Sequence, residues 1–398
     1  MSAFDEELVS RLKEVQEQGL YRQLRRLNSA QGARIEIGGK PLLNFSSNDY
    51  LGLANEPSLK EAALAAVNKF GAGTGASRLV CGSMPPHHQL EEALAAFKQT
   101  EAALAFSSGY AAAVGAICAL LDSNDVVVVD KLVHACIVDG ARLSGAKLRV
   151  FGHNNLDDLA KILRWADRRH ANPPLLPTDR RPRTLIIAES IYSMDGDQAP
   201  LREIVALKEK FGAWLMVDEA HATGLYGKMR RGLAEEHDVS TKIEIQMGTL
   251  GKAFGASGGY ICGSRPLIDL LINRARPFVF TTAPVPAAAA AAAEGVRLVQ
   301  SDAGEKRRNQ LWSNVTHLSR HIESKGSAII PIMIGDEQKA TQMSEGLRNH
   351  GVFIPAIRFP TVSRGQARLR LTISAAHSSE DIDQLLAALR AVNLASRS

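Results

Sequence analysis

The chain has 398 residues, of which 45% are hydrophobic and 22% are charged, and its formal net charge is +5. This composition is that of a folded globular protein of two or three lobes, and it excludes a largely disordered chain. No long block of Lys and Arg alternates with aromatic residues, so we expect no nucleic-acid partner, and the small basic excess fits anionic small substrates.

The four cysteines form no C-x-x-C pair and are too few for a disulfide scaffold or a zinc ribbon, which indicates a reducing compartment. The N-terminal segment is acidic and amphipathic and lacks the apolar core of a signal peptide. The chain also has no apolar stretch of about 18 residues, the length that crosses a bilayer. We therefore expect a cytoplasmic protein without a membrane partner.

The first predicted element is a helix over 5–28, because Leu8, Leu12 and Val15 recur at helical spacing. Between about 56 and 300, helical patterns alternate with short apolar runs, many of them rich in β-branched residues. Such runs without polar alternation predict strands buried on both faces, as in a parallel sheet covered by helices. The runs are 125–130, 147–151, 184–190 and 214–221.

The Pro- and Arg-rich stretch 166–183 predicts an exposed connection, and the alanine run at 283–293 predicts a helix. After about 300, a charged helix is followed by short strands and further helices, a pattern typical of a smaller α+β lobe. The fold class is therefore α/β with a mostly parallel central sheet. The expected divisions are 1–55 (helix and short strands), 56–295 (large domain) and 296–398 (α+β domain).

The sharpest local motif is GTLGKAFGASGG at 248–259, in which Lys252 stands among five glycines. Glycine lets backbone approach a ligand closely. A lysine in such a crowded place loses solvent and becomes a nucleophilic amine that can form a Schiff base. A glycine turn with a solvent-facing lysine is the alternative.

The segment LMVDEAHATG places Asp218 and His221 at the end of a predicted buried strand. Ligands of open α/β sheets bind at the carboxyl ends of the strands. A carboxylate there can pair with the protonated ring nitrogen of pyridoxal phosphate. The alternative is a metal site with Asp-x-x-His as two ligands, but no further ligand cluster supports it, so we expect no metal.

Polar residues follow three other predicted elements. Ser107, Ser108 and Gly109 open a helix, whose free N–H groups suit a phosphate, although simple N-capping by serine is equally compatible. His134 follows the run 125–130 and can stack on a ring or shuttle a proton, or can be structural. Ser193 follows the run 184–190, where it lines the same sheet edge or merely belongs to a loop.

Together these residues supply a phosphate site, a carboxylate, imidazoles and an amine, which is the set that pyridoxal phosphate requires. The order of the features, with 34 positions between Asp218 and Lys252, is similar to that of the aspartate-aminotransferase-like fold, known as fold type I of the pyridoxal-phosphate enzymes.

Over nearly its whole length the chain resembles the α-oxoamine synthases, pyridoxal-phosphate enzymes that condense an amino acid with an acyl thioester and release CO₂. The resembling segments are GLYR (19–22), NFSSNDYLGL (44–53), GAGTGASRLVCGS (71–83), SSGY (107–110), VHA (133–135), SMDGD (193–197), VDEAHATG (217–224), GTLGKAFG (248–255), PAIRFPTV (355–362) and RLRLTISAAH (368–377).

The resemblance implies a role for each matching residue. Lys252 holds the cofactor through a Schiff base, Asp218 pairs with the pyridinium nitrogen, His221 contacts the side of the ring hydroxyl, and His134 stacks on the ring. The implied catalytic set is Lys252, His134, Asp218 and His221. The implied cofactor contacts are Gly109, Tyr110, His134, Ser193, Asp218, His221, Thr249 and Lys252.

For the substrates, the resemblance implies contacts from Arg22, His134, Arg358, Thr361 and Arg370. Arg370 is the expected clamp for the amino-acid carboxylate, with Arg358 as the second candidate, because a guanidinium pairs with a carboxylate through two parallel hydrogen bonds.

Within the family, 355–362 and the segment that follows resemble most closely the members that join L-alanine to pimeloyl-CoA or a pimeloyl-acyl carrier protein in biotin biosynthesis. A member that joins glycine to acetyl-CoA is the first alternative. The family's sites lie between two subunits, so we expect a homodimer in which 280–286 and 71–83 reach the partner's cofactor.

Two alternatives from other classes remain. One is a non-catalytic binding protein on the same fold, against which the intact set of Lys252, Asp218, His134 and His221 argues. The other is a dinucleotide-binding oxidoreductase, but the glycine loop 71–83 lacks the G-x-G-x-x-G pattern and does not follow a predicted strand.

Overall fold

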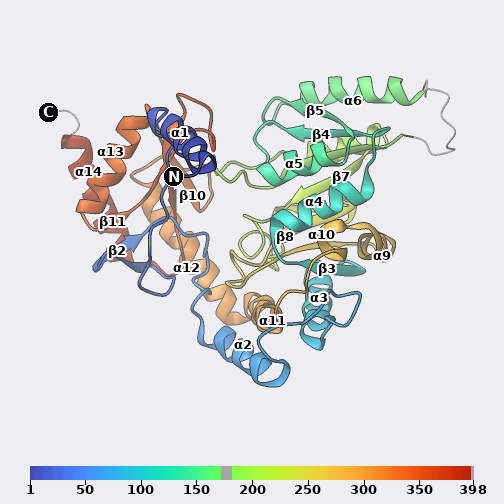
Figure 1. Cartoon of the computed structure of the whole chain (residues 1–398), viewed down its shortest axis with the longest axis horizontal. Helices are drawn as coiled ribbons and strands as arrows, with labels where there is room; N and C mark the ends of the chain where they lie inside the picture. Colours follow the sequence, from blue (N-terminus) through green and yellow to red (C-terminus); the bar gives the residue numbers. More distant parts are fainter. Residues whose placement is uncertain (172–181, 396–398) are drawn as a thin grey trace. The chain divides into compact units, whose positions relative to one another are not determined.

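The computed structural model describes residues 1–171 and 182–395 of the chain (Figure 1). The contacts within it divide the chain into two compact units. The larger unit comprises 47–330 and 372–382, and the smaller unit comprises 1–46, 331–371 and 383–398. The smaller unit thus joins the first segment of the chain to segments from its last quarter.

The larger unit is built on a seven-stranded sheet in the described part of the chain, with the strand order β3-β9-β8-β7-β6-β4-β5. β9 is antiparallel to both of its neighbours, and the other pairs are parallel, which confirms the mostly parallel sheet. The strands are β3 (Ala102–Phe106), β4 (Val126–Asp130), β5 (Lys147–Phe151), β6 (Thr184–Glu189), β7 (Trp214–Asp218), β8 (Ile245–Thr249) and β9 (Gly259–Gly263).

Helices cover this sheet, with α4 and α5 packed against each other and α4 lying on β8 and β9 (Figure 1). α6 lies on β4 and β5, and α7 lies on β7. The helices are α2 (Pro57–Phe70), α3 (Pro85–Lys98), α4 (Gly109–Leu120), α5 (Ala135–Leu143), α6 (Leu156–Ala171), α7 (Leu201–Lys210), α8 (Leu233–Glu236), the 3₁₀ turn Ser240–Lys242, α9 (Arg265–Arg274), α10 (Arg276–Val279), α11 (Pro286–Gln300) and α12 (Asp302–Ser319).

The centre of the sheet is its most deeply buried part. Every residue of β4 is buried, and so is every residue of β6. Burying an aliphatic side chain of this size contributes about 1.5–3 kcal/mol, so these short apolar runs supply much of the free energy that holds the sheet together. Strands buried on both faces need no polar alternation, which is the pattern that the sequence shows.

The smaller unit contains two three-stranded sheets, with the orders β1-β2-β11 and β10-β13-β12. β10, β13 and α14 cross the boundary between the units. The elements are α1 (Ala3–Glu17), β1 (Arg34–Ile37), β2 (Lys40–Asn44), β10 (Ile329–Gly335), α13 (Glu337–Asn349), β11 (Val352–Phe353), β12 (Ala356–Ile357), β13 (Ala367–Thr372) and α14 (Ser379–Ala395).

The helix predicted over 5–28 is wrong at its C-terminal end, because α1 stops at Glu17. Gly19 follows with a φ of +67°, a left-handed conformation that glycine adopts without strain and that ends the helix. The alanine run does form a helix, α11. Of the predicted connection 166–183, residues 166–171 belong to α6 instead, and 172–181 lie outside the described residues.

Among the residues that the structure describes, no helix combines the length and the apolar character that crossing a membrane requires.

Candidate active site

The predicted cofactor residues all lie in the larger unit, at the C-terminal ends of parallel strands. This edge of the sheet is where ligands of such folds bind. Gly109 and Tyr110 follow β3, His134 follows β4, Ser193 follows β6, Asp218 ends β7 with His221 three residues later, and Thr249 ends β8 with Lys252 three residues later.

Three ionisable side chains at this end of the strands influence one another's charge: Asp218, Lys252 and His134. Asp218 is buried, and burial raises the pKa of its carboxyl, while the positive charge of Lys252 opposes that shift. Burial lowers the pKa of His134, and Lys252 lowers it further. A buried carboxylate gains stability from a cation beside it, so Asp218 suits a protonated ring nitrogen.

The loop that carries Lys252 is held in one shape by its own backbone. The N–H of Leu250 donates to Gly258, and the N–H of Gly255 donates to the carbonyl of Lys252, at 2.9 Å in both cases. Gly255 has a φ of +65°, and a Cβ there would collide with the backbone of Leu53. Only glycine therefore lets this loop pack closely on the NDYLGL segment.

The start of α4 is the candidate site for a phosphate. Ser108 caps the helix by accepting a hydrogen bond from the N–H of Ala111 at 3.1 Å. A Cβ on Gly109 would lie 2.5 Å from Cγ2 of Thr249, so glycine is required where the helix meets the end of β8. Oγ1 of Thr249 is buried and has no hydrogen-bond partner among the described residues. A buried hydroxyl of this kind beside a helix N-terminus fits a phosphate group.

The Tyr110 side chain makes a hydrogen bond of its own. Its hydroxyl donates to Oδ2 of Asp139 on α5 at 2.8 Å, and this bond raises the pKa of the phenol. The side chain is 49% exposed. The hydroxyl of Tyr110 is therefore engaged by Asp139.

His221 is tied to a residue that the sequence analysis did not single out. Its Nδ1 lies 2.5 Å from the hydroxyl of Tyr50, and both side chains are buried. The two rings meet edge to face, with their centroids 6.0 Å apart. This contact orients the imidazole, and the only sequence signal for it was that Tyr50 belongs to the NDYLGL segment.

Two more residues were missed at the same edge. Glu189, the last residue of β6, is buried and accepts hydrogen bonds from the backbone N–H groups of His134 and Ser193. Cys136 is buried two positions after His134, with its Sγ 3.0 Å from the imidazole Nδ1. For Glu189 a signal existed, since it ends an apolar run just as Asp218 does.

Of the predicted substrate residues, Arg22, Arg358 and Thr361 come together within the smaller unit. Nη2 of Arg22 donates to Oγ1 of Thr361 at 3.3 Å, and Nη1 of Arg358 donates to the carbonyl of Gly19 at 3.1 Å. All three line a pocket of about 540 Å³, which also contains Arg25. Arg370 is buried on β13 of the same unit and does not line this pocket.

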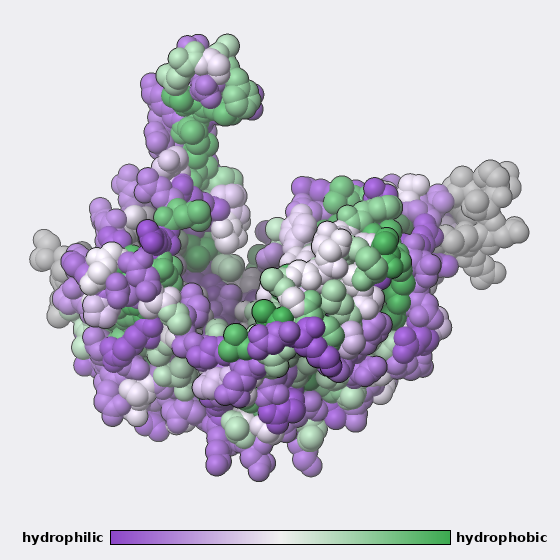
Figure 2. Space-filling model, turned by 60° about the horizontal axis from the view of Figure 1, so that its bottom comes forward, coloured by the Kyte–Doolittle hydropathy of each residue, from purple (hydrophilic) through white to green (hydrophobic). Residues whose placement is uncertain are grey.

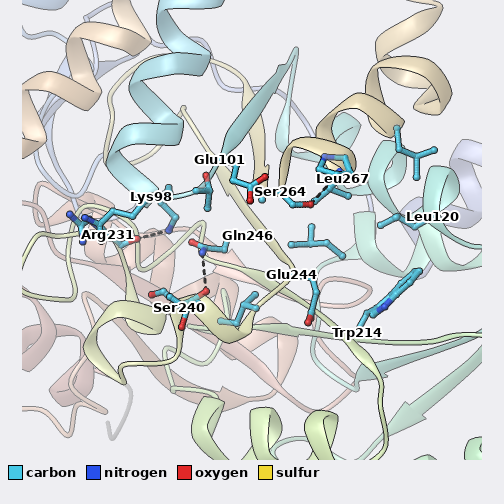
Figure 3. Close-up of a pocket in the computed structure, with 18 residues that line it drawn as sticks. Lys98, Glu101, Leu120, Trp214, Arg231, Ser240, Glu244, Gln246, Ser264 and Leu267 are labelled. Atoms are coloured by element: carbon cyan, nitrogen blue, oxygen red, sulfur yellow. Dashed lines mark hydrogen bonds between the residues drawn. The ribbon is translucent and has the colours of Figure 1, made fainter.

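A separate cavity of about 580 Å³ opens at the other end of the parallel strands, where β7 and β8 begin (Figure 3). It is lined by Trp214 and Ile245, the first residues of β7 and β8, and by Lys98 at the end of α3. Nζ of Lys98 donates to the carbonyl of Arg231 at 2.5 Å. None of the predicted site residues lines this cavity, so it is distinct from the candidate active site.

No three His, Cys, Asp or Glu side chains are grouped to hold a metal ion within residues 1–171 and 182–395. Asp218 and His221 are therefore not part of such a cluster in the described chain.

Comparison with known proteins gives a consistent result. Residues 40–389 match the family model described as aminotransferase class I and II. The chain is 42% identical over 392 residues to an 8-amino-7-oxononanoate synthase of Symbiobacterium thermophilum, covering 97% of each chain. Among solved structures it is similar to a serine palmitoyltransferase with pyridoxal phosphate (30% identity, TM-score 0.88, 99% and 100% of the two chains). It is also similar to the 8-amino-7-oxononanoate synthase of Francisella tularensis (27% identity, TM-score 0.74, 90% and 99%).

Proposed function

This chain belongs to the α-oxoamine synthases within the aminotransferase class I and II family, and we propose that it is an 8-amino-7-oxononanoate synthase of biotin biosynthesis. It joins L-alanine to a pimeloyl thioester and forms 8-amino-7-oxononanoate, CO₂ and the free thiol. The observation that carries the proposal is the group formed by Asp218, Lys252 and His134 at one edge of a fold-type-I sheet.

The cofactor is pyridoxal phosphate, which when bound provides an electron sink for the charge that develops on the amino acid. The residues of the larger unit fit it. The start of α4 and the hydroxyl of Thr249 would hold the phosphate, and the Asp218 carboxylate would keep a proton on the ring nitrogen. Lys252 would hold the cofactor covalently through its amine.

The same residues can carry the proton transfers. After L-alanine has displaced it, the freed Lys252 Nζ is the group that we assign to take the α-proton of L-alanine and later to return one, because it is the amine closest in the chain to the cofactor cradle at Thr249. Proton transfer by a positioned side chain contributes about 10²–10⁴-fold to a rate. His134 contacts the substrate and supplies a hydrogen bond from its imidazole.

The smaller unit carries the charges that suit the acyl partner. A pimeloyl group ends in a carboxylate, whereas an acetyl group does not. The pocket with Arg22, Arg25 and Arg358 contains one acidic residue, Glu345, so its net charge is positive and favours a dicarboxylic acyl chain. Arg370 would clamp the carboxylate of the amino acid.

We also infer that the enzyme is a homodimer, from an exposed apolar surface on the larger unit. The loops 71–83 and 280–286 are joined by hydrogen bonds between Thr74 or Ala76 and Ala283. Together they expose Leu79, Val80, Phe280 and Val285, at 52%, 78%, 72% and 42%. Figure 2 shows hydrophobic residues gathered in patches among hydrophilic ones on the molecular surface. A second copy of the chain would cover this surface.

The experiment that tests the function is a substrate panel. Free thiol and CO₂ release would be followed with L-alanine plus pimeloyl-CoA, L-alanine plus a pimeloyl-acyl carrier protein, and glycine plus acetyl-CoA. Turnover with L-alanine and either pimeloyl thioester supports the proposal. Turnover only with glycine and acetyl-CoA would show that the chain is a different α-oxoamine synthase.

A further inference from the structure

Cys136 forms hydrogen bonds with Nδ1 of the His134 imidazole. His134 caps the start of α5, where its Nδ1 accepts a hydrogen bond from the backbone N–H of Cys136 at 3.2 Å. A ring nitrogen that accepts from an N–H cannot itself carry a proton. The neutral ring therefore has its proton on Nε2.

The thiol of Cys136 adds a second donor to the same nitrogen. Its Sγ lies 3.0 Å from Nδ1 of His134, and the side chain is buried. Burial raises the pKa of this thiol, and the negative charges of Asp218 and Glu189 raise it further. The sulfur therefore keeps its hydrogen, and the S–H group donates to the imidazole.

Glu189 holds His134 from the backbone side. Its Oε1 accepts a short hydrogen bond from the N–H of His134, and its Oε2 accepts one from the N–H of Ser193 at 3.3 Å. His134 and Ser193 lie in the loops that follow β4 and β6. One buried carboxylate thus joins two loops that carry proposed cofactor contacts.

We propose that Cys136 and Glu189 are positioning residues for His134, which they hold in one place as the neutral tautomer with its proton on Nε2. Glu189 fixes the backbone at the start of α5, and Cys136 saturates Nδ1 with donors. The ring then presents one polar group, the Nε2–H donor, to its surroundings. The importance of this for turnover rests on the proposed function, but the tautomer itself does not.

The charged groups around the imidazole of His134 have opposite effects on its pKa. Asp218 at the end of β7 and Asp139 on α5 favour the protonated ring, while Lys252 after β8 and the burial of the ring disfavour it. Because these influences compete, the two donors on Nδ1 decide whether the ring stays neutral. A cation at this position would repel Lys252 and a protonated cofactor ring.

The test is a ¹⁵N–¹H spectrum of the apoprotein labelled at histidine, recorded from pH 5 to 9. The His134 signals are assigned by their absence from His134→Gln. We expect the Nε2–H pattern for the wild type and for Cys136→Ser, whose hydroxyl still donates. In Cys136→Ala the backbone N–H still donates to Nδ1, so the ring should keep its proton on Nε2, but the Nδ1 signal should shift and the ring should become protonated at a higher pH. Cys118→Ala, which removes a partly buried thiol bonded to the Gly140 carbonyl, should leave the His134 signals unchanged.

The role of Glu189 is tested by comparing Glu189→Gln with a control variant at Glu219. Glu219 is also buried and also accepts two backbone hydrogen bonds, from Leu233 and Ala234. Glu189→Gln should broaden the His134 signals and raise the dissociation constant of pyridoxal phosphate by about 2- to 12-fold, as expected when a buried hydrogen bond is lost. Glu219→Gln should lower the melting temperature and change neither quantity.

Each result decides the proposal. An Nδ1–H pattern in the wild type would overturn it, and so would an unchanged His134 spectrum in both Cys136→Ala and Glu189→Gln. If Glu189→Gln does not fold, the comparison of Cys136→Ala with Cys136→Ser still decides the assignment of the donor on Nδ1. Because these spectra need neither cofactor nor turnover, their outcome is separate from that of the substrate panel.

Discussion

The hydroxyl of Tyr50 lies 2.5 Å from Nδ1 of His221, although the two residues are 171 positions apart. This contact links the NDYLGL segment to the loop after β7 inside the larger unit. Because a buried polar group that loses its partner costs free energy, the contact gives His221 one preferred orientation. The proposed cofactor site therefore depends on a residue that does not itself follow a strand of the central sheet.

Replacing Tyr50 by Phe should weaken cofactor binding. The variant keeps the ring but removes the hydrogen bond between the Tyr50 hydroxyl and Nδ1 of His221, a loss of about 1–3 kcal/mol. We expect the dissociation constant of pyridoxal phosphate, measured by equilibrium dialysis, to rise by about 5- to 150-fold. Tyr226→Phe is the matched control, since its buried hydroxyl donates to Gly326 at 2.9 Å. It should lower stability without changing the affinity, and equal affinities in the two variants would contradict the role of Tyr50.

Replacing Asp218 by Asn should raise the stability of the apoprotein but lower the turnover of the enzyme. The raised pKa of Asp218 means that the folded apoprotein holds this proton more tightly than the unfolded chain. Stability from this residue is therefore lost as the pH rises above about 4. We expect a higher melting temperature for the variant apoprotein at pH 8 and a turnover at least about 100-fold lower. A lower melting temperature of the apoprotein would contradict the electrostatic description.

His153 should stabilise the protein only while it is protonated. Burial disfavours its charge, but hydrogen bonds to Asp130 at 3.0 Å and Asp197 at 2.8 Å outweigh burial and raise its pKa to about 9. The stabilisation is complete below about pH 6.5 and is lost as the pH rises through about 9. His153→Gln should therefore lower the melting temperature most at pH 6 and least at pH 9.5. The exposed His350→Gln serves as control, and a pH-independent deficit for His153→Gln would rule out the ion pairs as its cause.

Removing a charge from the pocket of the smaller unit should change acyl selectivity. Arg22→Ala deletes a guanidinium that can pair with the distal carboxylate of a pimeloyl group, a contact worth about 1.5–3 kcal/mol. We expect kcat/KM for the pimeloyl thioester to fall by about 10- to 150-fold, with little change for any residual activity on acetyl-CoA. Arg320→Ala, an exposed arginine outside the pocket, should leave both values unchanged. An equal fall for both thioesters would argue against recognition of the carboxylate.

The sheet was predictable only where the strands carry their own signal. The valine-rich β4 and the run 214–221, which contains β7, were recognised because β-branched and large apolar residues favour buried strands. β3, β8 and β9 were not, since AALAF, IQMGT and GYICG are rich in small or mixed residues. Their strand character comes from pairing with neighbours in the sheet, which no local pattern contains.

Some residues of the candidate site could likewise be identified from the sequence, and others could not. Lys252 and Asp218 could be identified because each follows an apolar run or sits in a glycine-rich loop. Cys136 was missed although it lies only two positions after His134. Tyr50 and Glu189 were missed because their contacts depend on how segments far apart in sequence pack together, although Glu189 also ends an apolar run. The contact of Glu189 with His134, for example, joins residues 55 positions apart.

The most direct test of the account is to identify the lysine that holds the cofactor. The holoenzyme would be reduced with borohydride, digested, and analysed by mass spectrometry for the peptide that carries the pyridoxyl group. We predict that the group is found on Lys252 and that Lys252→Ala abolishes both the labelling and the turnover. Labelling of another lysine, such as the buried Lys98 at the opposite edge of the sheet, would contradict the central claim.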